Sequence, residues 1–190
     1  MPAIDPYTIR PAQTDDDLRG ILSLQDANHF DTLAPSDRLL LGFVSLRHDL
    51  ALLREMNSPD PHLLATNSGR VVAYALVTRP EFRGRIPLLD PMFEHTDRLA
   101  SPGGPLHALR WYVMGQVCVD PAHRGRGLVS RLYAGHRERM SARFDAMVSE
   151  IDLDNARSLR AHEKAGFVRL LEYPAPDGRR WAIVSLDLRD

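Results

Sequence analysis

The stretch from Trp111 to Phe167 restricts the possible folds more than any other part of the sequence. An apolar strand pattern, Trp111–Val119, leads through a Gly- and Arg-rich turn into a helical pattern that runs from Gly127 to about Arg143. A second strand pattern at Ala146–Leu153 and a second helical pattern at Asn155–Ala165 follow. This order predicts at least one parallel crossover and helices that cover the sheet.

The rest of the chain fits the same fold class, a mixed α/β (α+β) domain that spans residues 1–190. The sequence predicts further strands at Tyr7–Arg10, His62–Asn67, Arg70–Thr78, Phe167–Tyr173 and Trp181–Leu188, and further helices at Asp15–Ala27 and Arg38–Met56. The run Val71–Val77 is apolar throughout, as expected for a strand covered on both faces. Pro174–Gly178 is expected to turn the last two strands into a hairpin.

The connection from Arg79 to Arg110 has no regular period, because prolines and glycines interrupt it. A connection of this length inside a compact domain is usually functional. Two interpretations remain open. It is either a packed surface insertion with short helices around Met92–Leu99, or a segment that covers a substrate.

The composition is that of one globular domain, with 190 residues, of which 44% are hydrophobic and 26% charged. A formal net charge of -1 gives no field toward nucleic acid or anionic membranes, so neither is an expected partner. Cys118 is the only cysteine, and the histidines show no metal-binding spacing, so no metal site is expected. The sequence shows no signal peptide and no membrane-spanning run, and a cytoplasmic location is the expectation.

An anion-binding turn is predicted between the strand Trp111–Val119 and the helix that begins near Gly127. Its residues are Arg124-Gly125-Arg126-Gly127. The first turn of a helix has unpaired N–H groups and a partial positive charge, and glycines let a phosphate approach the backbone. Two arginines add charge and fork-shaped donors. The turn is therefore suited to a pyrophosphate group.

Other interpretations of this turn are weaker but open. Arg-Gly pairs also occur in solvated loops, and the turn would then be incidental in a nucleic-acid or protein-binding module. A Walker A loop is excluded, because no Gly-Lys-Ser/Thr sequence follows. An RNA-binding Arg-Gly tract would need repetition and an excess of basic charge.

The turn and its flanks resemble the acetyl-coenzyme A (acetyl-CoA) signature of the GNAT superfamily of N-acetyltransferases, Gln/Arg-x-x-Gly-x-Gly/Ala. Arg124 and Gly127 fill the first two positions, whereas Val129 stands where the family usually has Gly or Ala. The resemblance implies a mostly antiparallel sheet, flanked by helices and splayed where acetyl-CoA enters. The cofactor-binding residues that it implies are Val117, Cys118, Val119, Arg124, Gly125, Arg126, Gly127, Val129, Ser130 and Asn155.

A second resemblance covers Asn155 to Phe167, where the family has an Asn and then a helix that ends in Tyr-x-Lys-x-Gly-Phe. Asn155 is a suitable N-cap, and Gly166 is a suitable left-handed stop. His162 stands at the position of the tyrosine. The resemblance therefore implies that His162 protonates the departing CoA thiolate. A histidine packed against the sheet is the alternative.

The implied reaction is direct acetyl transfer to an amine, which could be a small molecule or a peptide. Glu150 and Asp152 share one face of their strand, and Glu150 is the candidate general base. The alternative for Glu150 is an ordinary solvated carboxylate. Cys118 is expected to be a small buried hydrophobe rather than a nucleophile.

A second function is also open. The departures at His162 and Val129 favour a protein that binds acyl-CoA as a sensor or scaffold with little or no catalysis. The sequence leaves the acceptor, the length of the acyl group and a homodimer undecided.

Overall fold

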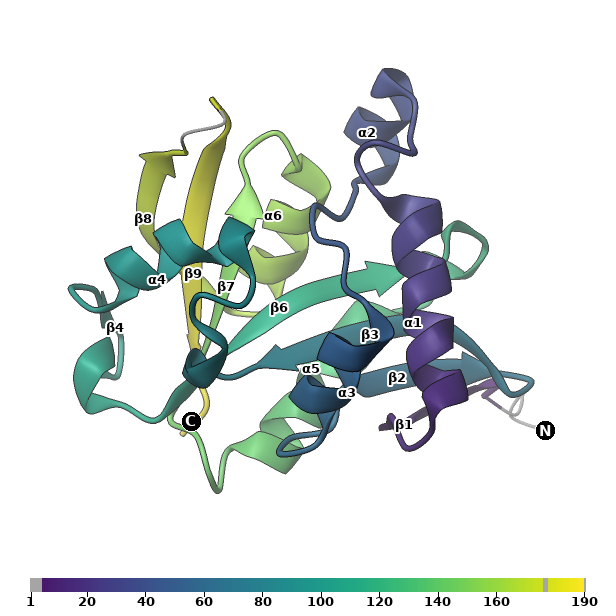
Figure 1. The fold of residues 1–190 in the computed structure, drawn as a ribbon, viewed down its shortest axis with the longest axis horizontal. Coiled ribbons are helices and arrows are strands. Elements are labelled where there is room, and N and C mark those ends of the chain that lie inside the picture. Colours follow the sequence, from purple (N-terminus) through teal and green to yellow (C-terminus); the bar gives the residue numbers. More distant parts are fainter. Residues whose placement is uncertain (1–4, 176–177, 190) are drawn as a thin grey trace.

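A seven-stranded sheet organises the protein in the computed structural model, which describes residues 5–175 and 178–189. The strands lie in the order β1-β2-β3-β6-β7-β9-β8, and neighbours are antiparallel except β6 and β7, which are parallel (Figure 1). Their bounds are β1 (Tyr7–Pro11), β2 (Leu63–Asn67), β3 (Arg70–Thr78), β6 (Trp111–Val119), β7 (Ala146–Asp152), β8 (Val168–Pro174) and β9 (Arg180–Asp187). The predicted mixed, mostly antiparallel sheet is confirmed.

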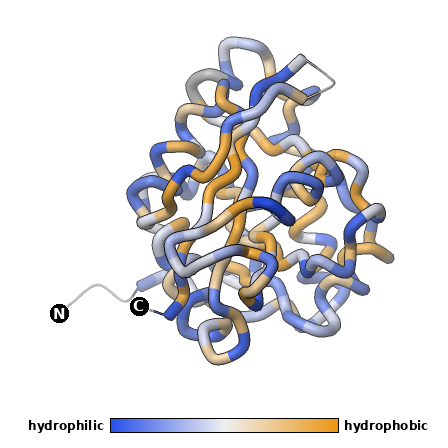
Figure 2. Tube along the Cα trace, turned by 90° about the vertical axis from the view of Figure 1, so that its left-hand side faces the viewer, coloured by the Kyte–Doolittle hydropathy of each residue, from blue (hydrophilic) through white to orange (hydrophobic). Residues whose placement is uncertain are grey.

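Helices cover both faces of this sheet. Helices α1 (Asp15–Asn28) and α3 (Leu50–Asn57) lie on one face, and α5 (Leu128–Met140) lies on the other with α6 (Ala156–Lys164) (Figure 1). Alternate residues of β3 serve the two faces, so that Tyr74 packs with α1 and Ala73 with α5. The strand is buried on both sides, as its apolar run predicts. Figure 2 shows the same distribution, with hydrophobic segments running through the middle of the molecule.

Helix α1 begins where the sequence predicts. Thr14 is its N-cap, and the side chains of Thr14 and Asp17 bond reciprocally to the backbone of the first turn. Arg10 at the end of β1 donates two hydrogen bonds to Asp17, of 2.6 and 2.8 Å. These contacts fix the helix to the first strand.

The predicted helix Arg38–Met56 is wrong. The structure divides it into α2 (Pro35–Leu41) and α3, with an irregular segment at residues 42–49. Gly42 ends α2 with a φ of 70°, and Asp49 starts α3 by accepting a hydrogen bond from the backbone of Leu52. The segment between them bonds through Val44 to Asn28 and Phe30 at the end of α1. Residues 42–49 therefore lie beside the C-terminal end of α1.

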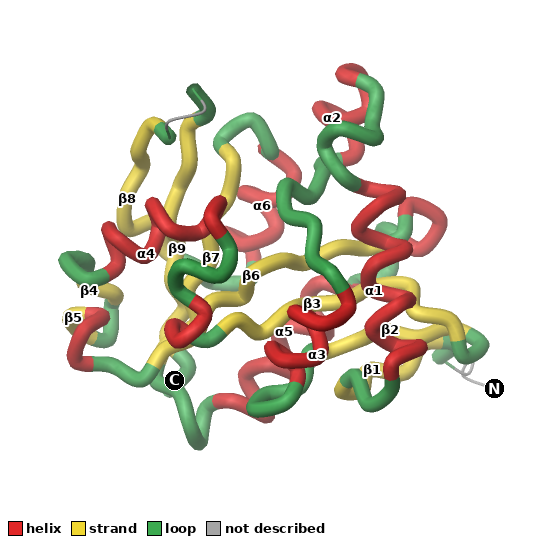
Figure 3. The backbone as a smooth tube through the Cα atoms, viewed as in Figure 1, coloured by secondary structure: helices red, strands yellow, loops and turns green. Residues whose placement is uncertain are grey.

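The sheet forks between β6 and β7. These strands pair only over Trp111–Val113 and Ala146–Val148, and beyond that point they diverge, as Figure 3 shows. The Ser149 hydroxyl donates to the Met114 carbonyl at 3.1 Å and closes the base of the fork. The register of β3 and β6 also shifts here, a bulge of the kind found next to active sites. The fork leaves the β7 side of the C-terminal half of β6 without a paired strand.

The connection from Arg79 to Arg110 is a packed layer. It contains short 3-10 turns at Pro80–Phe82 (η1), Pro87–Leu89 (η2) and Leu106–Ala108 (η3), the helix α4 (Asp90–Thr96), and the short strands β4 (Ala100–Ser101) and β5 (Gly104–Pro105). Its buried residues Met92 and Phe93 belong to the same cluster as Trp111 and Trp181 of the main sheet. The expectation of short helices is met, although α4 begins two residues before the predicted Met92.

The remaining boundaries differ little from the prediction. Helix α5 ends at Met140, whereas the sequence pattern extends to about Arg143. The turn predicted at Pro174–Gly178 falls partly on residues 176–177, which lie outside the described residues. Within the described chain, every helix is too short or too polar to cross a bilayer.

Candidate active site

A cleft of about 200 Å³ opens where the C-terminal half of β6 meets the starts of α5 and α6. We name it the first cleft. Its lining comes from α1, the 42–49 segment, β6, residues 124–127 (the glycine turn), the start of α5 and the start of α6. The lining residues include Asn28, Phe43, Val44, Val117, Cys118, Val119, Arg124, Gly125, Gly127, Val129, Ser130, Asn155, Arg157 and Ser158. The cleft therefore collects all but one of the sequence-predicted cofactor residues.

The glycine turn presents free backbone to the first cleft. Gly125 and Gly127 have φ values of 73° and 72°, in the left-handed region that favours glycine. A Cβ atom added at either position would meet nothing within 4 Å, so both face open space. Gly127 is the N-cap of α5 and provides no side-chain cap, and the first turn that follows contains no acidic residue. The helix dipole and the N–H groups of this turn therefore favour an anion.

Arg124 is held in place by the protein on two sides. Its Nε donates to the Val119 carbonyl at 3.1 Å, and one terminal nitrogen donates to the Asn28 side chain at 2.9 Å. The other terminal nitrogen is buried and has no hydrogen-bond partner among the described residues. Burial lowers the pKa of Arg124, and the positive charge of Arg157 lowers it further. A bound anion would relieve both effects.

Arg157, His123 and Asn28 also line the first cleft, although the sequence motifs do not identify them. Arg157 lies in the first turn of α6, two residues after the N-cap Asn155, which is the one local signal that points to it. The structure places the predicted Arg126 differently. Its side chain is exposed, and Arg126 is not part of the cleft lining.

A second cleft of about 60 Å³ adjoins the first at the fork of the sheet. The two share Phe43, Val44, Val117, Asn155 and Ser158. The remaining lining of the second cleft is Ser45, Leu46, Leu88, Leu89, Gly115, Gln116, Ser149, Glu150, Ile151, Asp152, His162 and Trp181. The two predicted catalytic residues, His162 and Glu150, are thus brought to one place.

The charges of the two clefts are opposite. The first cleft contains Arg124 and Arg157, and its described lining has no carboxylate. The second cleft contains Glu150 and Asp152, and its described lining has no lysine or arginine. The first cleft therefore favours an anion and the second a cation.

His162 is buried on the α6 side of the fork, with 2% of its surface exposed. Its Nδ1 lies 2.9 Å from the Ser158 carbonyl, which can only accept, so Nδ1 carries the hydrogen. Its Nε2 is then a bare lone pair, buried with no hydrogen-bond partner among the described residues. Burial lowers the pKa of His162 to about 4. At neutral pH the ring is neutral and stores no proton for a thiolate, unlike the acid implied by the family resemblance.

The two carboxylates of the second cleft have different environments. Glu150 accepts a hydrogen bond from the Tyr173 hydroxyl of β8. Asp152 is buried, and this burial raises its pKa, although Arg179 lies 3.4 Å away and lowers it in part. The Arg179 guanidinium also lies 4.7 Å from the Trp181 ring. Both carboxylates can accept a proton from a ligand in the cleft.

Asn155 joins the two parts of the cavity wall. Its side-chain oxygen accepts from the Ser158 backbone at 3.2 Å and caps α6, while its amide nitrogen donates to the Phe43 carbonyl at 2.9 Å. Asn155 thus fixes the 42–49 segment against the start of α6. Cys118 is buried, and this burial raises the pKa of its thiol to about 12, so it is no ready nucleophile.

The forked sheet and the glycine turn at a helix N-terminus are the features expected for the class of acetyltransferases whose two motifs the sequence resembles. The sequence profile of the acetyltransferase (GNAT) family matches residues 11–167, and the chain belongs to that family. This membership confirms the resemblance. No curated protein matches the chain in sequence.

Solved structures show the same fold. yncA, a putative acetyltransferase from Salmonella typhimurium solved with its cofactor acetyl-CoA, has a TM-score of 0.63 at 21% identity and covers 97% of this chain and 95% of its own. The ribosomal-protein-S18-alanine N-acetyltransferase from Escherichia coli has a TM-score of 0.61 at 16% identity, with coverage of 97% and 95%. A phosphinothricin acetyltransferase from Sinorhizobium meliloti, in complex with AcCoA, has a TM-score of 0.63 at 17% identity, with coverage of 96% and 89%.

Proposed function

We propose that the protein is an acetyl-CoA-dependent N-acetyltransferase that transfers the acetyl group directly to an amine. The observation that carries this proposal is the pair of adjoining clefts of opposite charge at the fork of the sheet. A phosphate-rich donor fits the cationic end. An ammonium group fits the anionic end, and the two would meet beside Val117 and Ser158.

The first cleft fits the coenzyme. The N–H groups of the first turn of α5 and the guanidinium groups of Arg124 and Arg157 suit its phosphates. The side of β6 that faces β7 has no paired strand from Gly115 to Val119, and it suits the amide-containing arm, which would add to this edge like a strand. Val129 leaves the backbone N–H of its turn available. When bound, the donor supplies a thioester carbonyl as the electrophile.

The protein's own residues move the protons. Glu150 takes the proton from the incoming ammonium, directly or through water, with Asp152 as the second candidate on the same face. The neutral amine attacks, a C–N bond forms and the C–S bond breaks. His162 Nε2, a lone pair in the resting protein, accepts the second amine proton and returns it to the departing sulfur. The ring thus begins and ends the reaction neutral.

Release of free CoA thiol together with acetylated amine tests this proposal. Wild-type protein and acetyl-CoA should give both products in equal amounts with at least one amine of a mixed panel. Glu150→Gln and His162→Ala should each lower turnover by about 10²-fold, within the range of general acid–base catalysis, while acetyl-CoA affinity changes little. Glu163→Gln is a suitable control, because Glu163 lies on α6 outside both clefts. Binding of acetyl-CoA without acetylation of any amine would instead identify a sensor or scaffold.

A further inference from the structure

The second cleft has an asymmetric distribution of charge. Glu150 and Asp152 extend from alternate positions of β7 into the part of the cavity beyond the fork. Arg179, which is not part of the lining, forms an ion pair with Asp152 at 3.4 Å and offsets part of this negative charge. The cleft therefore attracts an ammonium group, and a carboxylate on the neighbouring carbon would lie against like charge.

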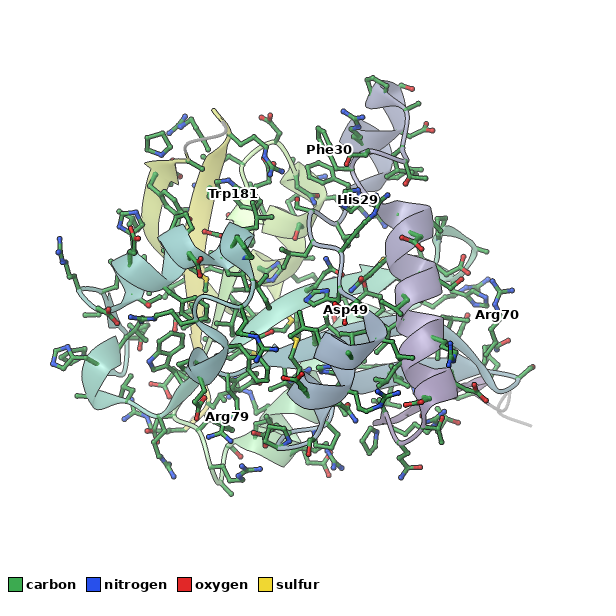
Figure 4. All side chains as sticks on the ribbon, viewed as in Figure 1. His29, Phe30, Asp49, Arg70, Arg79 and Trp181 are labelled. Carbon is green, nitrogen blue, oxygen red and sulfur yellow. The ribbon has the colours of Figure 1, made fainter. Side chains whose placement is uncertain are left out.

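The opposite wall of the second cleft is apolar. It consists of Leu46 from the 42–49 segment and of Leu88 and Leu89 from η2, while Trp181 of β9 lies beside Asp152, with which it pairs across the strands. Leu46, Leu89 and Trp181 are 8%, 3% and 5% exposed, so these surfaces are already packed in the protein. In Figure 4, Trp181 lies toward the β9 side and Phe30 toward the α2 side at the same end of the molecule. Leu88 is only partly buried, so an apolar substituent of an acceptor would contact its side chain.

The size of the second cleft limits what can enter. Its volume is about 60 Å³, against about 200 Å³ for the first cleft, so the second cleft is much the smaller of the two. This volume suits an aminomethyl group whose substituent rests on the leucines. Leu88 and Leu89 belong to the packed layer from Arg79 to Arg110, which is anchored by Phe93, so this wall is part of the folded core.

From these three features, and given the proposed acetyl transfer, we propose that the acceptor is a compact primary amine. It carries an apolar substituent and has no carboxylate beside the amino group. The proposal separates simple alkyl- and arylalkylamines from amino acids, which carry the carboxylate. It also separates them from polypeptide N-termini, whose chain would have to pass the wall formed by Leu88 and Leu89.

Matched acceptors test this proposal. The value of kcat/KM should be measured for isoamylamine against leucine, for phenethylamine against phenylalanine, and for a short peptide with leucine at its N-terminus. Each simple amine should exceed its amino acid by about tenfold or more, since like-charge contacts across a binding site cost at least this factor. The peptide should be a poorer acceptor than isoamylamine.

Variants connect the preference to the named residues. Asp152→Asn removes one negative charge and should narrow the ratio of isoamylamine to leucine, whereas the control Glu163→Gln should leave the ratio unchanged. Leu89→Ala shortens a side chain of the lining and so enlarges the second cleft, which should raise kcat/KM for phenethylamine relative to isoamylamine. Leu99→Ala is the matched control, because Leu99 lies in the same layer but not in the cleft lining.

The outcomes separate this proposal from the proposed function. Equal or better turnover of leucine or of the peptide overturns the acceptor class and leaves acetyl transfer intact. An unchanged preference in Leu89→Ala also overturns it. Absence of turnover with every amine, although acetyl-CoA binds, overturns the proposed function and the acceptor class with it.

Discussion

Replacing His162 with Gln should remove a defined part of the protein's sensitivity to acid. In the folded protein burial lowers the pKa of His162 to about 4, whereas a histidine in an unfolded chain titrates near about 6.5. The unfolded chain therefore takes up the proton first as the pH falls. The stabilising contribution is fully present above about pH 6.5 and is lost progressively toward pH 4.

The magnitude follows from this difference. Between pH 7 and pH 5 roughly 1.5 pH units lie below the unfolded pKa, and each is worth about 1.4 kcal/mol, so this ring accounts for about 2 kcal/mol of lost stability. His62 and His136 are also buried, with pKa values lowered by burial to about 3 and about 4. They remain in the variant, so their contributions cancel in the comparison.

The assay is urea unfolding of wild type and His162→Gln at pH 7 and pH 5, with the loss of unfolding free energy compared between the two proteins. The wild type should lose about 2 kcal/mol more than the variant. The glutamine amide can still donate to the Ser158 carbonyl, and any constant destabilisation drops out of the difference. His107→Gln at an exposed position should lose as much as wild type. Equal losses in wild type and His162→Gln would refute the buried neutral ring and, with it, the proton relay.

Three other perturbations have expected results. Arg124→Ala and Arg157→Ala should each weaken acetyl-CoA binding by about 1–3 kcal/mol in calorimetry, whereas Arg126→Ala, at an exposed position, should have a smaller effect. Equal effects at all three positions would contradict the assignment of the first cleft as the phosphate site. Tyr173→Phe removes the hydroxyl that donates to Glu150 and should lower kcat by about tenfold with the KM for acetyl-CoA unchanged, and an unaltered kcat would show that the contact is only structural. Gly115→Ala places a Cβ atom 2.6 Å from Thr78 Oγ1 and should cost about 1–3 kcal/mol in thermal or urea unfolding. Adding Thr78→Ala should recover part of that loss, because the Thr78 hydroxyl is buried without a recorded partner; no recovery would place the strain elsewhere.

The sequence predicts those elements whose signals are local. The apolar runs of β3 and β6 and the N-cap of Asn155 need no distant contact to be recognised. The prediction of one helix at Arg38–Met56 is wrong because it runs across Gly42 and Asp49, which have the local character of a helix stop and an N-cap and act as such in the structure. Tertiary contacts also stabilise the irregular segment between α2 and α3, since Val44 bonds to the end of α1.

The site residues likewise fall into those that a local motif predicts and those that depend on tertiary contacts. Arg124, Gly125 and Gly127 follow from the motif, because a glycine turn before a helix binds anions by itself. The hydrogen bond from Arg124 to Asn28 joins residues 96 positions apart, and no spacing in the sequence predicts it. The protonation of His162 also depends on burial and on the Ser158 carbonyl, which only the folded helix provides.

The central claim is direct transfer of the acetyl group across the fork, and an initial-rate matrix tests it most directly. Acetyl-CoA and an accepted amine should be varied together, and the protein should be examined by mass spectrometry after incubation with acetyl-CoA alone. Direct attack requires both substrates to be bound at once, so the reciprocal plots should intersect and the protein should carry no acetyl group. Parallel lines and an acetyl group on Cys118 would contradict the account, because the reaction would then pass through an acetylated enzyme.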